Sequence, residues 1–247
     1  MLGIGGIELK SGMSLGEDVQ LSDLTEQFDA VFLGIGLRDV NSPSIEGDSL
    51  DGVENAVDFI AKLRQTQDYS TLDVGEKVLV IGGGMTAIDA AVQSKMLGAS
   101  DVTIAYRRGA ENMNASEYEQ HLAQTQGVVI KHFLQPQRFV GDSSGHISSA
   151  ELARVSTENG VLSPTGERIT INADQVFLAI GQALQPAALG SVALDMQGNR
   201  IVVNADQQTS HEKIFAGGDC VSGGDDLTVS AVQDGKLAAE AIHRRLA

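Results

Sequence analysis

The sequence predicts an α/β protein in which one α/β domain carrying a β-meander is inserted into a second domain. Three observations predict it. A strand–helix–strand unit occupies residues 76–108, and several short strand-like segments separated by Gly, Ser and Pro follow it. Two similar strands, DAVFLGIG at 29–36 and DQVFLAIG at 174–181, bracket both features. This order of elements is expected when one domain is inserted between two segments of another domain.

The first part of the chain predicts a strand, a link and a helix. Residues 30–33 form a short apolar run that ends in glycine, which is typical of a strand buried on both faces of a parallel sheet. Residues 41–52 (NSPSIEGDSLDG) are rich in turn formers and make a link. Apolar residues then recur at helical spacing through ENAVDFIAKLRQ, so we expect an amphipathic helix there.

The central unit predicts a strand at 78–81, a helix at 85–97 that Gly98 ends, and a strand at 102–106. Asn114 with Glu117 three residues later resembles a capping box that opens a helix through SEYEQHLAQ. The segments VVIKHFL, QRFVGD, ISSAELARV and RITI then predict a β-rich crossover appended to the parallel sheet.

Domain boundaries follow from the repeated strand. We expect residues 46–181 to form the inserted domain and residues 1–45 and 182–247 to form the other. The hairpin VALDMQGNRIVVN and the final strand and helix of KIFAGGDCVSGGDDLTVSAVQDGKLAAEAIHRRLA belong to the second set.

Composition excludes several classes of function. Seventeen basic against 33 acidic residues give a net charge of −16, which opposes a nucleic-acid footprint. The single Cys220 excludes an internal disulfide or a cysteine-ligated cluster in this chain, and we expect it to be a buried thiol of a cytoplasmic protein. No apolar run reaches the roughly 18 residues that a membrane span needs. No metal site, catalytic triad or carboxylate pair is expected, so cofactors would carry the chemistry.

Residues 82–87 (GGGMTA) read G-x-G-x-x-A directly after a strand and at the start of a helix. Gly82 would permit the tight turn, Gly84 would let the backbone approach a pyrophosphate, and Ala87 would let helix and strand pack closely. The helix N-terminus would offer N–H groups to that pyrophosphate. The alternative is a merely structural glycine turn. The motif in this context predicts a Rossmann-like dinucleotide site.

Two arginines, Arg107 and Arg108, stand where a site that prefers NAD usually has an acidic residue. Their guanidinium groups could pair with a 2′-phosphate, which favours NADP. Alternatively, one or both stack on the adenine or face solvent, and NAD stays open.

The C-terminal IFAGGDCV predicts a second cofactor contact. A strand that ends in Gly-Gly-Asp could aim Asp219 at a ribityl hydroxyl and set the amides of residues 227–229 against a flavin. The alternative is that Asp219 only caps the following turn.

Together, VLVIGGGMTAIDAA, VTIAYRRG, the FLGIG and FLAIGQ strand ends and IFAGGDCVSGGDDLTVSAVQDGKLAAEAI resemble the pyridine-nucleotide:FAD oxidoreductase module. This module occurs in the glutamate synthase small subunit and in dihydropyrimidine dehydrogenases, and the small subunit of the bacterial NAD-dependent dihydropyrimidine dehydrogenase is most similar. The resemblance implies a flavoprotein fold with two dinucleotide-binding domains, FAD in the split domain and NAD(P)H in the inserted one.

The resemblance also implies which residues contact the cofactors. Besides Gly82, the nicotinamide dinucleotide would contact Gly83, Gly84, Met85 and Thr86 at its pyrophosphate, Arg107 and Arg108 at its adenosine end, and Ala179, Ile180 and Gly181 at its nicotinamide side. FAD would contact Gly218, Asp219 and Thr228.

One family feature is absent from this sequence. Members begin with a cysteine-rich segment for iron–sulfur clusters and a separate G-x-G-x-x-G for the FAD diphosphate, and neither is present. We therefore expect a truncated chain that is inactive alone, retains nicotinamide-dinucleotide binding and binds FAD very weakly or not at all.

By the resemblance, the intact protein would pass hydride from NAD(P)H to FAD and electrons onward to iron–sulfur clusters and a large partner subunit that reduces a pyrimidine. Two alternatives stay open. One is a glutamate synthase or ferredoxin:NADP transhydrogenase module, and the other is a non-catalytic NAD(P)-binding domain.

Overall fold

The structure is a computed structural model that describes residues 3, 5–37, 39–158, 160–224 and 227–247. It divides into two compact units. We call Val40–Gly181 the inserted unit, and Met1–Asp39 together with Gln182–Ala247 the split unit.

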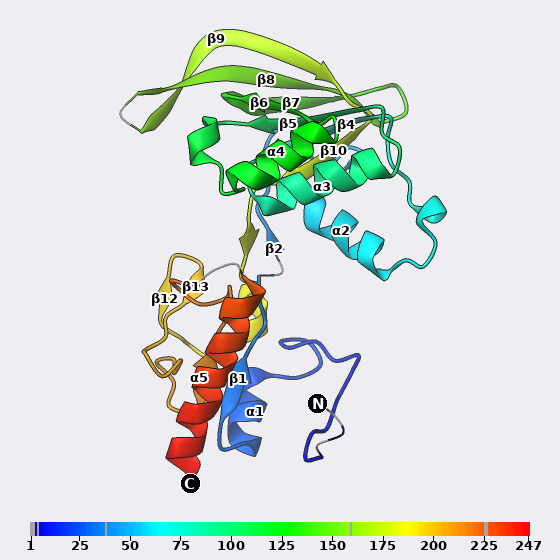
Figure 1. Ribbon diagram of the computed structural model, residues 1–247. Coiled ribbons are helices and arrows are strands. Elements are labelled where there is room, and N and C mark those ends of the chain that lie inside the picture. Colours follow the sequence, from blue (N-terminus) through cyan, green and yellow to red (C-terminus); the bar gives the residue numbers. More distant parts are fainter. Residues whose placement is uncertain (1–2, 4, 38, 159, 225–226) are drawn as a thin grey trace. The chain divides into compact units, whose positions relative to one another are not determined.

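The inserted unit is built on a five-stranded parallel sheet in the order β3-β10-β4-β5-β6. Its strands are β3 (Val53–Asn55), β4 (Lys77–Gly82), β5 (Asp101–Tyr106), β6 (Val129–His132) and β10 (Gln175–Ala179). In Figure 1 helices cover one face of this sheet and an antiparallel sheet of three strands covers the other. The helices are α2 (Ala56–Gln65), α3 (Met85–Met96) and α4 (Glu117–Thr125), and the antiparallel strands are β7 (Leu134–Gly141), β8 (Ile147–Glu158) and β9 (Val161–Asn172).

The position of β4 between two cores explains why its sequence is continuously apolar. Val78 and Val80 belong to the core beneath the helices, whereas Leu79 and Ile81 belong to the core beneath the antiparallel sheet. Successive side chains of a strand point to opposite faces, so a strand buried on both faces needs apolar residues at every position. The predicted strand–helix–strand unit is confirmed, with ends within one residue of those expected.

Two details of the prediction were wrong. The capping box of α4 uses Ser116 and Glu119, not Asn114 and Glu117: Ser116 Oγ accepts from Glu119 N at 3.2 Å, and Glu119 Oε2 accepts from Ser116 N at 2.7 Å. The segment VVIKHFL does not start the meander, because β6 joins the parallel sheet beside β5. The chain turns towards β7 at Phe133, which has a φ of 59°.

In the split unit, β1 (Val31–Leu33) pairs in parallel with β14 (Ile214–Ala216), and the chain ends in α5 (Thr228–Leu246). The expectation that β1 is buried on both faces was wrong for Phe32, which is 40% exposed although Leu33 is buried. The ring of Phe32 lies beside Gly217 and Gly235, which have no side chains to cover it. The other elements of the split unit are short: α1 (Leu21–Gln27), the hairpin β12 (Met196–Gln197) and β13 (Arg200–Ile201), and the 3₁₀ turn η4 (Pro186–Leu189). The 3₁₀ turns η2 (Tyr69–Thr71) and η3 (Ala110–Asn112) belong to the inserted unit, and the short strands β2 (Asp39–Val40) and β11 (Gln182–Ala183) lie where the chain passes from one unit to the other.

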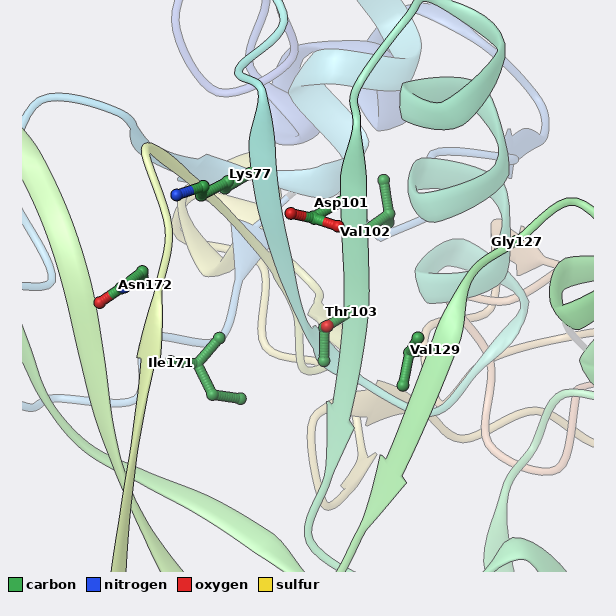
Figure 2. Close-up of a pocket in the computed structure, with 8 residues that line it drawn as sticks. All are labelled: Lys77, Asp101, Val102, Thr103, Gly127, Val129, Ile171 and Asn172. Atoms are coloured by element: carbon green, nitrogen blue, oxygen red, sulfur yellow. The ribbon is translucent and has the colours of Figure 1, made fainter.

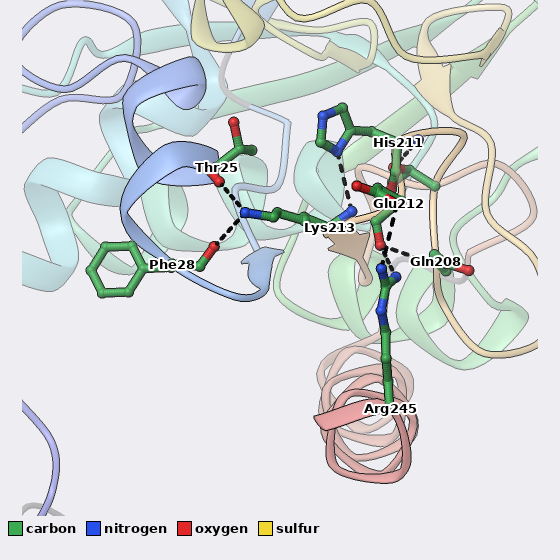
Figure 3. Close-up of polar contacts among 8 residues, drawn as sticks. Thr25, Phe28, Gln208, His211, Glu212, Lys213 and Arg245 are labelled. Atoms are coloured by element: carbon green, nitrogen blue, oxygen red, sulfur yellow. Dashed lines mark hydrogen bonds and ion pairs between the residues drawn. The ribbon is translucent and has the colours of Figure 1, made fainter. Parts of the chain in front are cut away.

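The turn before β14 holds both helices of the split unit (Figure 3). Lys213 Nζ donates to the carbonyl oxygens of Thr25 and Phe28 at 2.8 and 3.4 Å, so it satisfies acceptors at the C-terminal end of α1. Arg245 near the end of α5 donates to the Glu212 carbonyl and pairs with the Glu212 carboxylate at 3.7 Å. Two adjacent residues therefore anchor α1 and α5.

Replacing Phe177 by Ala should destabilise the inserted unit by about 3–5 kcal/mol, because the side chain is fully buried and leaves a cavity. Phe177 also stacks on Phe59 with ring centroids 4.4 Å apart. Hydrogen exchange of β10 and α2 peptides in increasing urea measures the effect. Phe28→Ala is the matched control because Phe28 is 52% exposed; similar losses for the two variants would contradict this account of the core.

Candidate functional site

The glycine-rich turn lies where the strand order of the inserted unit reverses. From β4 the chain passes through α3 to β5 and then to β6 on one side, whereas β10 pairs with the other side of β4. In open parallel sheets, ligands bind at the carboxyl ends of the strands at such a switch point. Ala179 of β10 is in register with Gly82 of β4, so the segments 82–86 and 179–181 lie beside each other at this edge.

The three glycines of the turn have different surroundings. Gly82 has a φ of 151°, and a β-carbon there would collide with the carbonyl oxygen of Ala179. A β-carbon on Gly83 would lie 2.5 Å from the ring of Tyr106. Beside Gly84 the nearest atom that a β-carbon would meet is 4.0 Å away, on Asn114. Gly84 is therefore the position where a ligand can approach the backbone closely.

The helix that follows presents a free N-terminus to this space. Gly84 is the N-cap of α3 and provides no side-chain cap. The first backbone bonds run from Ala87 N and Ile88 N to Gly84 O, which leaves the N–H groups of Met85 and Thr86 without intrahelical partners. Unpaired N–H groups and the positive end of the helix dipole favour an anion here.

Arg107 and Arg108 follow β5 at the same edge of the sheet. Both side chains are exposed, and neither forms an ion pair or hydrogen bond with another residue in the part of the chain that the structure describes. The carboxylate of Glu111, in the same segment, lies against Gly109 and does not pair with either arginine. The arginines therefore remain available to an anionic ligand.

Asn41 contacts the segment that follows β10, and the sequence did not predict this role. Its backbone N donates to Gly181 O at 3.1 Å, and its Nδ2 donates to Ile180 O at 3.4 Å. The residue therefore fixes the turn after β10. No local pattern could have revealed it, because Asn41 lies in the turn-rich link predicted from sequence and its partners are some 140 positions further along the chain.

In the split unit, Gly218 and Asp219 follow β14. Gly218 has a φ of 83°, and a β-carbon on Gly36 would lie 3.3 Å from Asp219 Oδ1. Asp219 makes no side-chain hydrogen bond to another described residue, so the structure shows no capping of the following turn by this carboxylate. Asp234 of α5, which the sequence analysis also missed, accepts from Gly218 N at 2.9 Å. Thr228 is the first residue of α5, and Leu227, the N-cap residue, provides no side-chain cap.

Cys220 is a buried thiol, as predicted. Its Sγ lies 3.3 Å from the carbonyl oxygen of Gly217 and 3.7 Å from that of Leu33. Burial raises the pKa of the thiol, so it stays protonated near neutral pH.

A cavity of about 270 Å³ lies elsewhere in the inserted unit (Figure 2). Lys77 and Asp101, at the amino ends of β4 and β5, and Asn172 of β9 line it. It is therefore at the edge of the sheet opposite the glycine-rich turn. Among the described residues, no group of three or more His, Cys, Asp or Glu side chains is arranged to hold a metal ion. No helix in the described ranges is long and apolar enough to cross a membrane.

Comparison with known proteins gives a consistent result. The family model for pyridine nucleotide-disulphide oxidoreductases matches residues 6–235. The glutamate synthase [NADPH] small chain of Escherichia coli (strain K12) is 38% identical over 260 residues, which cover 96% of this chain and 54% of the relative. The NAD-dependent dihydropyrimidine dehydrogenase subunit PreT of the same organism is 34% identical over 242 residues, covering 98% and 53%. The chain thus spans about half the length of these relatives.

Solved structures share the fold at lower identity. Thioredoxin reductase of T. acidophilum superposes with a TM-score of 0.71 at 22% identity, covering 87% of this chain and 65% of that one. FprA of Mycobacterium tuberculosis in complex with NADPH gives 0.73 at 19%, covering 94% and 66%. These likenesses confirm the predicted fold class, a flavoprotein fold with two dinucleotide-binding domains.

Alanine at Gly82 and at Gly84 should have different effects on stability. At Gly82 the added methyl group strains the backbone and overpacks the contact with β10, which should cost about 1–3 kcal/mol. At Gly84 the methyl group enters open space, and the change should stay within about 0.5 kcal/mol. Urea-dependent hydrogen exchange of the inserted unit measures both. Equal destabilisation would show that the space beside Gly84 is filled.

Proposed function

Because the chain belongs to the pyridine nucleotide-disulphide oxidoreductase family, we propose that it is the electron-input module of an oxidoreductase. The inserted unit would bind NAD(P)H and the split unit would contribute to binding FAD. One observation carries the proposal: at the switch point of the sheet, a free helix N-terminus beside the open face of Gly84 lies at the same edge as two unpaired arginines.

The residues of the inserted unit fit a nicotinamide dinucleotide. Gly83, Gly84, Met85 and Thr86 would hold the pyrophosphate by backbone N–H groups and by the close approach that Gly84 allows. Arg107 and Arg108 would hold the adenosine end, and segment 179–181 would lie along the nicotinamide side. When bound, the nicotinamide and the flavin supply the hydride and electron chemistry, and this chain's own groups bind and orient them.

The residues of the split unit fit one part of FAD. Asp219 offers an acceptor that no described residue occupies to a ribityl hydroxyl, and the positive end of the α5 dipole lies at Thr228. In the described residues of this unit no strand leads directly through a G-x-G-x-x-G or G-x-G-x-x-A turn into a helix, and the glycines at 217–224, between β14 and α5, lack that spacing. The diphosphate therefore has no equivalent cradle there. We therefore expect FAD binding by this chain alone to be lost or very weak.

Two electron acceptors are compatible with this module, and both would lie on a larger partner subunit beyond iron–sulfur clusters. The motifs favour a pyrimidine-reducing partner. The unpaired arginines favour a partner of the glutamate synthase type, because the name of that relative includes NADPH, whereas the pyrimidine relative's name includes NAD. Cytoplasmic residence, which a lone cysteine favours, is part of the same proposal.

The choice between NADPH and NADH can be tested by calorimetric titration. If Arg107 pairs with the 2′-phosphate, Arg107→Ala should weaken NADPH binding by about 1.5–3 kcal/mol, the range for hydrogen bonds to charged groups, and leave NADH nearly unchanged. Arg168→Ala is the matched control, since Arg168 is another exposed arginine of the inserted unit. Equal losses for both dinucleotides would refute the phosphate role.

The FAD expectation is tested on the purified chain by its visible absorbance, before and after addition of FAD. We expect no stoichiometric flavin spectrum without added FAD and only weak binding after addition, because the diphosphate lacks a cradle. A yellow preparation with one flavin per chain would overturn this expectation. Dihydrouracil- or glutamate-dependent reduction of NAD(P), measured on the module with its large partner, then separates the two acceptors.

A further inference from the structure

The segment that carries the two arginines is bonded at its C-terminal end to α4, through Ala115 and Ser116, and to other described residues of the inserted unit by three further hydrogen bonds. We call residues 107–116 the arginine loop. Phe133 N donates to Arg108 O at 3.3 Å, Tyr106 Oη donates to Asn112 O at 2.6 Å, and Ala115 N donates to Gly83 O at 3.2 Å. Of these three bonds, only the one from Tyr106 comes from a side chain, so a substitution can remove it without altering the backbone.

Tyr106 touches both parts of the proposed dinucleotide site. It is the last residue of β5, and its ring lies on the helix side of the sheet, packed against that core. Three ring carbons lie 2.5–2.8 Å from where a β-carbon of Gly83 would be, so the ring fills the space that this glycine leaves. The hydroxyl at the other end of the ring reaches the arginine loop.

From these contacts we propose that Tyr106 is a positioning residue that holds the arginine loop against the glycine-rich turn and thereby sets a preference for NADPH over NADH. The inference rests on the proposed function, because it concerns how the same site distinguishes its ligands. The loop contains only the single 3₁₀ turn η3 (Ala110–Asn112), which is too short to order it alone. When a loop is already ordered in the free protein, ligand binding loses less conformational entropy, and the affinity is higher.

The consequence differs between the two dinucleotides. Pyrophosphate and nicotinamide contacts are common to both, whereas only NADPH has the 2′-phosphate that the arginines of the loop would hold. Loosening the loop should therefore weaken NADPH and leave NADH nearly unaffected. Tyr106→Phe retains the ring that packs on Gly83 and removes only the hydroxyl, and Asn112 is exposed, so water can satisfy the carbonyl that loses its donor.

The test is calorimetric titration of the full chain with NADPH and with NADH. Tyr106→Phe should weaken NADPH roughly threefold to tenfold, the effect of one lost hydrogen bond, and NADH by less than about twofold. Tyr118→Phe is the matched control, because this tyrosine of α4 is 75% exposed; it should change neither affinity.

A double-mutant cycle shows whether Tyr106 acts through the arginines. In an Arg107→Ala, Arg108→Ala background, Tyr106→Phe should cause no further loss of NADPH affinity. Equal losses for both dinucleotides, no loss for either, or an undiminished loss in that background would overturn the inference while leaving the proposed function intact. A wild-type chain that binds neither dinucleotide would overturn both.

Discussion

The inserted unit depends on the burial of β4 between two cores. Its apolar side chains alternate between the helices and the antiparallel sheet, so the strand cannot shift by one residue without exchanging the residues of the two cores. Its last residue, Gly82, lies so close to Ala179 of β10 that no side chain fits between them. This fixed strand end places the glycine-rich turn at the switch point of the sheet, and the proposed site depends on that position.

The glycine-rich turn shows how packing and binding share one short motif. Gly82 allows two strands to meet, Gly83 makes room for an aromatic ring, and Gly84 leaves the backbone open. The first two roles belong to the fold, and the third is the one that the proposed dinucleotide would use. A motif match alone cannot separate them, because the atoms that make Gly82 and Gly83 necessary, in Ala179 and Tyr106, are distant in sequence.

Two arginines of this acidic chain have no acidic partner in its described part. The net charge is −16, yet Arg107 and Arg108 have no acidic partner among the residues that the structure describes, whereas Arg138 and Arg154 both do. An exposed ion pair contributes little to stability, so leaving two arginines unpaired costs the fold little. It leaves both guanidinium groups available, and the proposed 2′-phosphate contact uses that availability.

The sequence by itself determined the elements whose signals are local. The apolar run of β4, the glycine-rich turn, the helix ended by Gly98 and the repeated strand ends predicted the α/β fold and its two-part organisation. Signals that depend on distant neighbours were misread or missed. The cap of α4 moved to Ser116, Phe32 proved exposed, β6 joined the parallel sheet, and Asn41, Tyr106 and Asp234 gained contacts that no spacing suggested. Local backbone preference and periodicity are properties of neighbouring residues, whereas which strand lies beside which, and what fills the space next to a glycine, are decided only when residues far apart in the chain are brought together.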